Sequence, residues 1–198
     1  MLFRSEAPLG GLQAARALGR TGYPRLLMLT SLSKRSNVPG MRSGFVAGDA
    51  ALVKPFLLYR TYHGSAMSGM VQRASIAAWN DEQHVVDNRE QYRRKFARVT
   101  PLLAPLMDVR LPDAGFYLWA GVPRRGDDAM PDDVEFARGL LAQYNVSVLP
   151  GSLLARQARG INPGAGRIRM ALVADTAECV EAAERIVAFT RSWAAGNR

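Results

Sequence analysis

The chain has 198 residues, of which 48% are hydrophobic and 22% charged, the balance of an ordinary soluble globular protein with a sizeable core. Its apolar runs fall far short of the roughly 18 residues that a membrane span requires, and no signal-peptide pattern opens it. A single cysteine, Cys179, excludes an internal disulfide and a cysteine-based metal site, and predicts a reducing, cytoplasmic environment.

The net charge of +9 makes nucleic acid a partner to consider. The arginines are spread along the chain, however, without a long basic block or a recognised nucleic-acid-binding motif. An anionic cofactor and substrate would also favour a positively charged cleft. The sequence therefore predicts no nucleic-acid partner, and a basic nucleic-acid-binding protein remains the weaker alternative.

The first part of the chain predicts α/β structure. Residues 12–18 form a short helical pattern that ends at glycines. The continuous apolar run at 26–29 is typical of a fully buried strand, and residues 45–49 indicate a second strand. Two short strands joined by a long loop predict the edge of a larger α/β sheet.

Three helices are predicted next, over residues 50–59, 68–79 and 81–106. The second is rich in small and apolar residues, so we expect it to pack deep. The third is long and amphipathic. Its inner stripe comprises Val85, Val86, Tyr92, Phe96, Val99, Leu102 and Leu103. Its water-facing side comprises Arg89, Arg93, Arg94, Lys95 and Arg98.

The remaining residues predict a smaller α+β unit. Strands are expected over residues 115–122, 146–149 and 167–173. Helices are expected over 132–144 and 176–193, and Asp175 or Thr176 should cap the last one.

The loop over residues 30–45 carries the side chains most suited to chemistry. Lys34 follows the predicted buried strand, where burial favours the neutral amine that attacks an aldehyde. Arg42 can hold a phosphate through two parallel hydrogen bonds, and Ser31 and Ser33 add hydroxyl groups. These groups suit an aldehyde-bearing phosphate cofactor, pyridoxal 5'-phosphate. From the residues alone, a solvated polar turn remains the alternative.

A second constellation lies in the predicted strand at 167–173. Arg167 and Arg169 point to the same face because strand side chains alternate. Two guanidinium groups on one face form a candidate carboxylate receptor. The alternative is the exposed face of an edge strand, where arginine is common.

The lysine loop resembles the cofactor-lysine signature of fold-type I, class I/II aminotransferases. In that family Ser-x-x-Lys is followed by Gly-x-Arg-x-Gly, and here the two parts are Ser31-Leu32-Ser33-Lys34 and Gly40-Met41-Arg42-Ser43-Gly44. The resemblance implies that Lys34 forms the Schiff base with pyridoxal 5'-phosphate. It also implies that Ser31 and Arg42 bind the phosphate, and we include Ser33 among the candidate cofactor-binding residues.

The resemblance extends to the substrate side. The segment Arg167-Ile168-Arg169-Met170-Ala171-Leu172 is similar to the family strand whose arginine binds the substrate α-carboxylate. This implies Arg169 as the carboxylate receptor, with Arg167 as the register alternative. Tyr62 begins a segment that falls where family members reach the neighbouring subunit's site, which implies a homodimer and a substrate-binding role for Tyr62.

The resemblance covers only the carboxy-terminal portion of the family. The implied organisation is a remnant of the large cofactor-binding domain over residues 1–80, a long interdomain helix over 81–107 and a small domain over 108–198. The family's aspartate that pairs with the cofactor ring nitrogen cannot be placed in this chain. We therefore expect a fragment, a truncated gene product or half of a split protein, with impaired activity.

Within the family the sequence is most similar to succinyldiaminopimelate aminotransferases, through SLSKRSNVPGMRSGFVAGD and YHGSAMSGMVQRASIAAWNDEQHV. The implied reaction is transamination between N-succinyl-diaminopimelate and 2-oxoglutarate in lysine biosynthesis. A catalytically inactive interaction module is the main alternative. No metal site is predicted, because the chain has only two histidines, His63 and His84, and a lone histidine is more often a surface or core residue.

Overall fold

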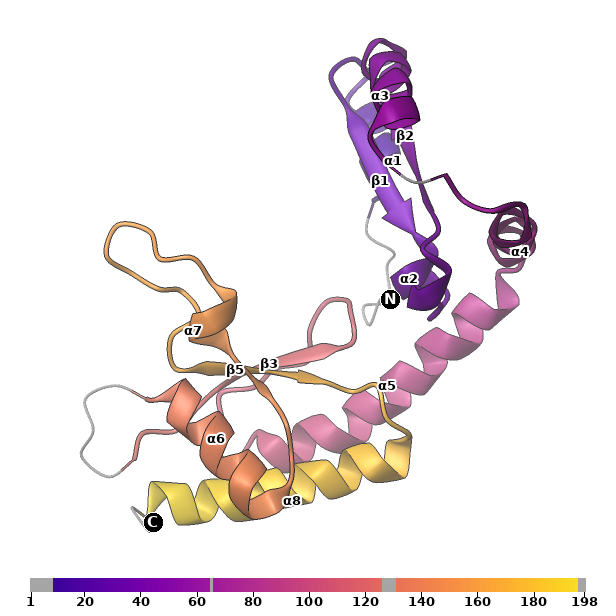
Figure 1. Ribbon diagram of the computed structural model, residues 1–198. Coiled ribbons are helices and arrows are strands. Elements are labelled where there is room, and N and C mark those ends of the chain that lie inside the picture. Colours follow the sequence, from indigo (N-terminus) through magenta and orange to yellow (C-terminus); the bar gives the residue numbers. More distant parts are fainter. Residues whose placement is uncertain (1–8, 65, 126–130, 196–198) are drawn as a thin grey trace. The chain divides into compact units, whose positions relative to one another are not determined.

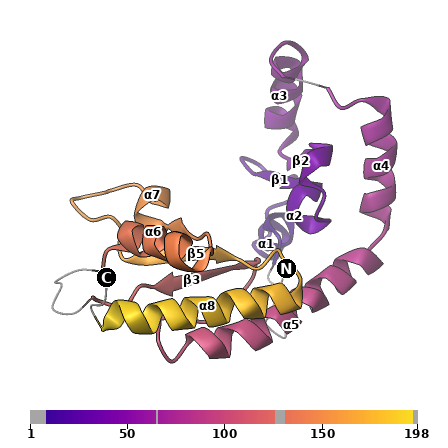
Figure 2. The same cartoon turned by 60° about the horizontal axis from the view of Figure 1, so that its bottom comes forward.

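The structure, a computed structural model, describes residues 9–64, 66–125 and 131–195 and consists of two compact units, Ser5–Asn88 and Arg89–Arg198. Figure 1 shows the helices and strands of both units, and Figure 2 shows them from a second direction. The long helix α5 (Gln83–Leu103) begins in the first unit and continues into the second. The mixture of helices and strands agrees with the predicted α/β class.

The first unit is built on a two-stranded antiparallel sheet in which β1 (Leu27–Ser31) pairs with β2 (Gly44–Gly48). The register places the last residue of β1 opposite the first residue of β2, so both ends of the connecting segment lie at one end of the sheet. The connection contains the short helix α2 (Leu32–Arg35) and the 3-10 helix η1 (Pro39–Met41). The further helices of this unit are α1 (Gly11–Ala17), α3 (Ala50–Tyr62) and α4 (Gly69–Asn80).

β1 forms where the apolar run predicted a strand, but it is not fully buried. Leu27 is 37% exposed and Leu29 is 72% exposed, whereas Met28 and Thr30 between and after them are half-buried. Within the described residues β1 pairs with β2 alone. The prediction of a fully buried strand is therefore wrong for this chain, because a two-stranded ribbon leaves the side chains of one face in water.

The helices α3 and α4 present apolar side chains that the described residues do not cover. α3 extends beyond the predicted end at residue 59 and has no buried residue. In α4 the buried residue is Ser75, so the expectation that this helix packs deep is wrong. The short helix α2 contacts it. The exposed large side chains of the two helices are Leu52, Phe56, Leu57, Leu58, Tyr59, Tyr62, Met70 and Ile76.

The second unit contains a three-stranded antiparallel sheet with the order β3-β5-β4. Its strands are β3 (Tyr117–Gly121), β5 (Arg167–Ala171) and the short β4 (Leu149–Pro150). Its helices are α6 (Asp133–Tyr144), α7 (Gly151–Leu154) and α8 (Thr176–Ala194). The predicted strand at 146–149 is thus shorter and shifted, because its backbone pairs with β5 only at the last position and at the proline that follows.

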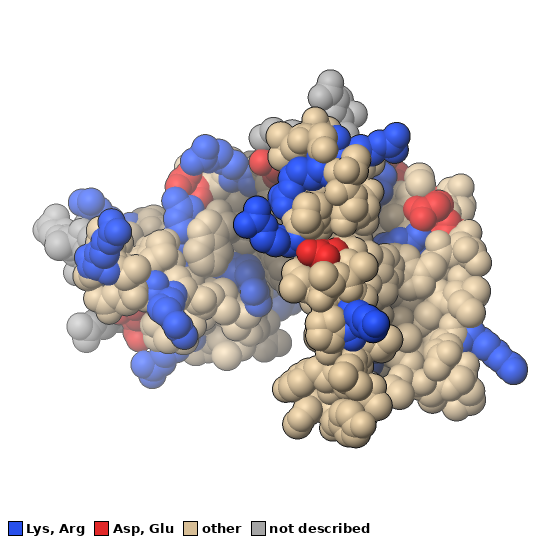
Figure 3. Space-filling view, turned by 90° about the horizontal axis from the view of Figure 1, so that it is seen from above, with Lys and Arg blue, Asp and Glu red and all other residues tan. Residues whose placement is uncertain are grey.

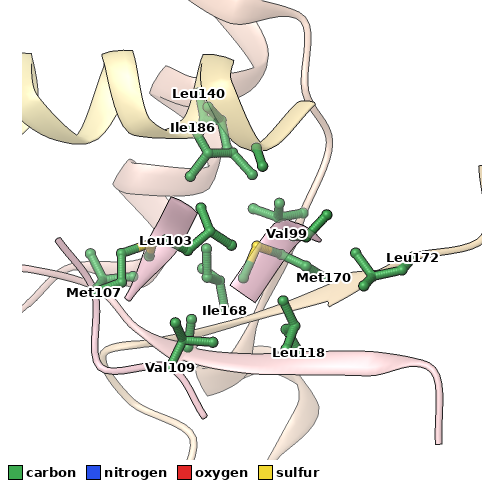
Figure 4. Close-up of a cluster of buried hydrophobic side chains, with 14 of the residues drawn as sticks. Val99, Leu103, Met107, Val109, Leu118, Leu140, Ile168, Met170, Leu172 and Ile186 are labelled. Atoms are coloured by element: carbon green, nitrogen blue, oxygen red, sulfur yellow. The ribbon is translucent and has the colours of Figure 1, made fainter. Parts of the chain in front are cut away.

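The core of the second unit lies between one face of this sheet and the helices α5, α6 and α8 (Figure 4). Alternate strand residues such as Leu118, Ile168 and Met170 point into it, and the residues between them point away. The opposite face of the sheet therefore remains available for other contacts. The core residues labelled in Figure 4 are Val99, Leu103, Met107, Val109, Leu118, Leu140, Ile168, Met170, Leu172 and Ile186.

The amphipathic pattern of α5 is largely as predicted, with two differences. Val86, assigned to the inner stripe, is 48% exposed. Lys95, assigned to the water-facing side, is only 6% exposed. Its Nζ donates hydrogen bonds to the carbonyl oxygens of Leu172 at 3.1 Å and Val173 at 3.4 Å. A lysine can be buried when its ammonium group is hydrogen-bonded in this way.

The last helix begins as expected, because the Asp175 carboxylate accepts a hydrogen bond from the backbone N–H of Glu178 at 2.8 Å. No helix in the described part of the chain is long and apolar enough to cross a membrane.

Candidate active site

The lysine loop occupies the connection between β1 and β2. Ser31 is the last residue of β1 and precedes α2, and Lys34 lies in the last turn of that helix with an exposed side chain. The backbone N–H of Leu32 donates to the carbonyl oxygen of Ser43 at 3.1 Å, which closes the loop at its base. The burial that we expected around Lys34 is not provided by the described residues, because β1 is itself partly exposed.

Gly44 is required by this closure. A Cβ atom at this position would lie 2.5 Å from the carbonyl oxygen of Thr30 and 3.1 Å from the Cβ of Ser31. The close approach of the two strands thus explains the second glycine of the Gly-x-Arg-x-Gly pattern.

Arg42 has a left-handed backbone conformation, with φ of 50° and ψ of 40°, at the end of η1. Its Nη1 donates a hydrogen bond to the carbonyl oxygen of Pro39 at 2.8 Å. The side chain is exposed, and its other N–H groups make no hydrogen bond within the described residues. One bond therefore orients the guanidinium group, and the remaining donors are available to an anion.

The loop fits an aldehyde-bearing phosphate. It supplies one amine, on Lys34, one guanidinium group, on Arg42, and the half-buried hydroxyls of Ser31 and Ser33. The hydroxyl of Ser31 is not used to cap α2, although this residue stands at the N-cap position. An amine condenses with an aldehyde, and guanidinium and hydroxyl groups bind phosphate oxygens, so the donor set has the chemistry that pyridoxal phosphate requires.

The two arginines of β5 lie on the face of the sheet that points away from the core, as predicted, but their surroundings differ. Nη2 of Arg167 lies 2.8 Å from the Asp108 carboxylate and forms an ion pair with it. The guanidinium carbon of Arg169 lies 4.5 Å from the ring centroid of Tyr117. Within the described residues Arg169 has no carboxylate partner, and its guanidinium group makes a cation–π contact with Tyr117.

Arg169 lies at the centre of a row of three cross-strand neighbours, one on each strand of the sheet. Trp119 on β3 and Leu149 on β4 are its direct neighbours in the register. Trp119 is 39% exposed and Leu149 is 44% exposed. The arginine is therefore flanked by apolar surface, an arrangement that can receive a molecule with a carboxylate and an aliphatic part.

The Pro-Gly-Ser turn after β4 packs against this row. A Cβ atom at Gly151 would lie 2.6 Å from the ring of Trp119 and 2.4 Å from the carbonyl oxygen of Gly164. The backbone N–H of Ser152 donates to the buried carboxylate of Asp133 at 2.7 Å. The turn is thus held in place from both sides, and no side chain larger than hydrogen fits at Gly151.

Tyr62 is the last residue of α3 and is 78% exposed. The next residue, His63, stacks on Tyr59 with ring centroids 4.6 Å apart. The structure therefore places Ser31, Ser33, Lys34 and Arg42 in one loop. Tyr62 lies on another element of the same unit, and the two candidate arginines share one strand of the second unit.

Sequence reasoning missed the residues that support the loop. Ser43 is buried, and its Oγ accepts a hydrogen bond from Ser75 Oγ of α4 at 2.7 Å. Arg35, next to the candidate lysine, contacts the end of α4. No signal in the sequence pointed to these residues, because their partners lie in α4, a helix that is distant from the loop along the chain.

Other candidate chemistry is weaker. Burial raises the pKa of the Cys179 thiol, which agrees with the predicted packing role. No group of three or more His, Cys, Asp or Glu side chains that could hold a metal ion occurs within residues 9–64, 66–125 and 131–195.

Comparison with known proteins identifies the class. Residues 7–186 match the family described as Aminotransferase class I and II. The chain therefore belongs to the class I and II aminotransferases, a family that depends on pyridoxal phosphate. The predicted resemblance is confirmed.

Individual relatives agree with this assignment. An aminotransferase from Neisseria meningitidis has a crystal structure that matches with a TM-score of 0.87 and 61% identity, over 96% of this chain and 47% of that chain. A probable N-succinyldiaminopimelate aminotransferase from Thermus thermophilus matches with a TM-score of 0.71 and 28% identity, over 95% of this chain and 46% of that chain. A probable aminotransferase from Mycobacterium tuberculosis is 37% identical over 161 residues, which is 80% of this chain and 34% of that protein.

The chain spans less than half the length of each of these proteins. The expectation that it corresponds to a portion of the fold-type I aminotransferase fold is therefore confirmed.

Proposed function

We propose that this chain takes part in pyridoxal-phosphate-dependent transamination between an amino acid and a 2-oxo acid. One observation carries the proposal: the amine of Lys34, the guanidinium of Arg42 and two serine hydroxyls lie in a single loop of a chain that belongs to the aminotransferase family. When bound, the cofactor would supply an electron sink for the carbanion at the substrate Cα.

Each residue of the loop would have a distinct role. Lys34 Nζ would hold the cofactor covalently and, once released by the substrate amine, would move the proton from the substrate Cα as a general base. Arg42 would hold the phosphate through the donors that Pro39 does not use. Ser31 and Ser33 would add hydroxyl hydrogen bonds to the same group.

On the substrate side, Arg169 would bind the α-carboxylate. The ion pair between Arg167 and Asp108 favours this choice, because a guanidinium group that already has a carboxylate partner gains less from a second one. Tyr62, exposed at the end of α3, would contact substrate in the neighbouring copy of a homodimer.

For the substrate pair we propose N-succinyl-diaminopimelate and 2-oxoglutarate, a step of lysine biosynthesis. The support is the similarity to the Thermus thermophilus protein at 28% identity and the exposed apolar row beside Arg169, which suits a long aliphatic chain. A cytoplasmic location is supported by the single cysteine.

We propose no nucleic-acid partner. On the face in Figure 3, the lysine and arginine side chains within each unit stand in several groups with uncharged surface between them. Nucleic-acid-binding proteins gather their basic residues in a patch or stripe along the backbone of the ligand.

The cofactor step is tested by trapping. The chain is incubated with pyridoxal phosphate and reduced with borohydride, and the modified lysine is located by peptide mass spectrometry. We expect modification at Lys34 and its loss in Lys34→Ala, whereas equal modification of Lys54 in α3 would show non-specific reaction and contradict the proposal. Arg42→Ala should weaken trapping with pyridoxal phosphate but not with pyridoxal, because only the former carries the group that Arg42 binds.

A catalytically inactive interaction module is the second candidate function. It is favoured by the absence of any buried residue in the described helix α3. If α3 forms an interface, Leu57→Glu should abolish self-association or partner binding, measured by light scattering after size exclusion, without changing the unfolding temperature. Specific trapping of pyridoxal phosphate at Lys34 would contradict a module that binds no cofactor.

A further inference from the structure

We propose that Arg35 is a positioning residue that holds Lys34 in place by anchoring α2 to the end of α4. This inference depends on the proposed role of Lys34, but the anchoring itself can be measured independently of any cofactor.

The side chain of Arg35 is 17% exposed and makes contacts on three sides. Its Nη1 donates to the carbonyl oxygen of Ala78 at 2.8 Å, and its Nη2 forms an ion pair with Glu82. The guanidinium carbon lies 4.8 Å from the ring centroid of Trp79. One planar group thus contacts a backbone carbonyl, a carboxylate and an aromatic face together.

These partners are suited to a cation. Ala78 lies in the last turn of α4, where carbonyl groups lack partners within the helix and the helix dipole favours positive charge. Trp79 is itself held by Phe45 of β2, with ring centroids 5.0 Å apart and an interplanar angle of 63°. Arg35 therefore joins α2 to a fixed point that also contacts the sheet.

The helix α2 needs such support. It has four residues and is closed by the hydrogen bond from Ser36 N to the Leu32 carbonyl oxygen at 3.0 Å. A helix this short is unstable by itself, because the conformational entropy lost in forming the first turn outweighs the free energy of its single hydrogen bond. The fully buried side chain of Leu32 and the contacts of Arg35 are what hold it to the rest of the unit.

The same arrangement recurs at the other end of the loop. Lys34 is exposed and the next residue, Arg35, is anchored to α4; Arg42 is exposed and the next residue, Ser43, is anchored to Ser75 of α4. The helix α4 thus fixes both groups that we assign to the cofactor, through their sequence neighbours. An amine and a phosphate-binding group must keep a fixed separation to bind one molecule at two points.

The test compares Arg35→Ala and Arg35→Lys with a matched control, Arg73→Ala, which removes an exposed arginine from α4. Amide hydrogen exchange of residues 31–43 measures the anchoring, and the rate of pyridoxal phosphate trapping at Lys34 measures its effect on the amine. For Arg35→Ala we expect exchange at the Ser36 amide to become roughly tenfold faster, because the charge-assisted contacts that anchor α2 to Ala78 and Glu82 are lost. We expect trapping at Lys34 to become roughly tenfold slower, with trapping at Lys54 unchanged. Arg35→Lys keeps the positive charge but not the planar guanidinium group. It should therefore show smaller changes than Arg35→Ala in both the exchange rate and the trapping rate.

If Arg35→Ala and Arg73→Ala give the same exchange rates, the anchoring role is overturned. It is also overturned if trapping falls while exchange stays unchanged, since Arg35 would then act by another route. If the wild-type chain shows no specific trapping at Lys34, the proposed function fails, and the exchange rates alone decide whether Arg35 anchors α2.

Discussion

Nη2 of Arg167 lies 2.8 Å from the carboxylate of Asp108, so the first arginine of β5 already has an acidic partner. The second arginine of the strand, Arg169, lies on the same face over the ring of Tyr117. Both arginines lie on one face of the same strand, yet their electrostatic surroundings differ, and this difference gives each arginine a distinct expected phenotype.

The first prediction separates the two arginines by ligand binding. Arg169→Ala should weaken binding of 2-oxoglutarate to the cofactor-loaded chain by about 2 kcal/mol, roughly thirtyfold in Kd, because a charge-assisted pair with the carboxylate is lost. Arg167→Ala should change this affinity little and should cost at most about 1 kcal/mol of stability, as expected for a partly exposed ion pair. Isothermal titration calorimetry and urea unfolding measure the two effects, and an equal loss of affinity in both variants would refute the assignment.

The second prediction concerns the base of the lysine loop. Gly44→Ala should lower the free energy of unfolding by about 1–3 kcal/mol, because the added methyl group collides with the Thr30 carbonyl oxygen. Gly40→Ala is the matched control, since a Cβ atom there would meet nothing within 4 Å. Urea unfolding should show no more than about 0.5 kcal/mol for the control. Equal losses of unfolding free energy in Gly44→Ala and Gly40→Ala would show that β1 and β2 can move apart at Gly44 without destabilising the fold.

The third prediction concerns the buried lysine of α5. Lys95→Met keeps an unbranched side chain, one atom shorter, but leaves the carbonyl groups of Leu172 and Val173 without their donor. It should lower the free energy of unfolding by about 1–3 kcal/mol. The neighbouring substitution Arg94→Met removes an exposed charge from the same helix and should change it by no more than about 0.5 kcal/mol. Urea unfolding measures both variants. An unchanged free energy of unfolding in Lys95→Met would show that water replaces the ammonium group as donor to the two carbonyl groups.

The fourth prediction is a dependence of stability on pH. The Asp49 carboxylate accepts hydrogen bonds from the backbone N–H groups of Arg25 at 2.6 Å and Ala51 at 2.8 Å. These bonds hold the pKa of Asp49 below its ordinary value of 3.8. A carboxyl group whose pKa is lower in the folded state stabilises the fold fully above its unfolded pKa, and this contribution is lost as the pH falls below 3.8 through the folded value.

In Asp49→Asn the free energy of unfolding should therefore fall less steeply as the pH decreases below 3.8. Urea unfolding at pH values above and below 3.8 measures this change. A curve that is as steep in Asp49→Asn as in the wild type would contradict the proposed linkage.

Several features of the fold could be predicted because they depend on neighbours in the sequence. The helix cap at Asp175 and the paired orientation of Arg167 and Arg169 follow from local hydrogen bonding and from strand alternation. The core-facing stripe of α5 follows in the same way from the helical period.

Most of the failed predictions concern burial. The apolar run before Lys34 and the apolar faces of α4 were expected to be covered, and within the described residues they are not. Periodicity identifies which side chains share a face, but it does not supply the element that covers that face.

By itself the sequence determined which reactive groups the chain carries and their order: Ser31, Lys34 and Arg42 in one loop, and two arginines in one later strand. This information is local, because a motif is a spacing of residue types along the backbone. Only the tertiary structure decided that Arg167 is paired with Asp108, and that the Nζ of Lys95 is bonded to a carbonyl 77 residues away. It likewise decided that Arg35 and Ser43 connect the lysine loop to α4. Such contacts join residues far apart in the chain, so their energies depend on packing that no short stretch of sequence contains.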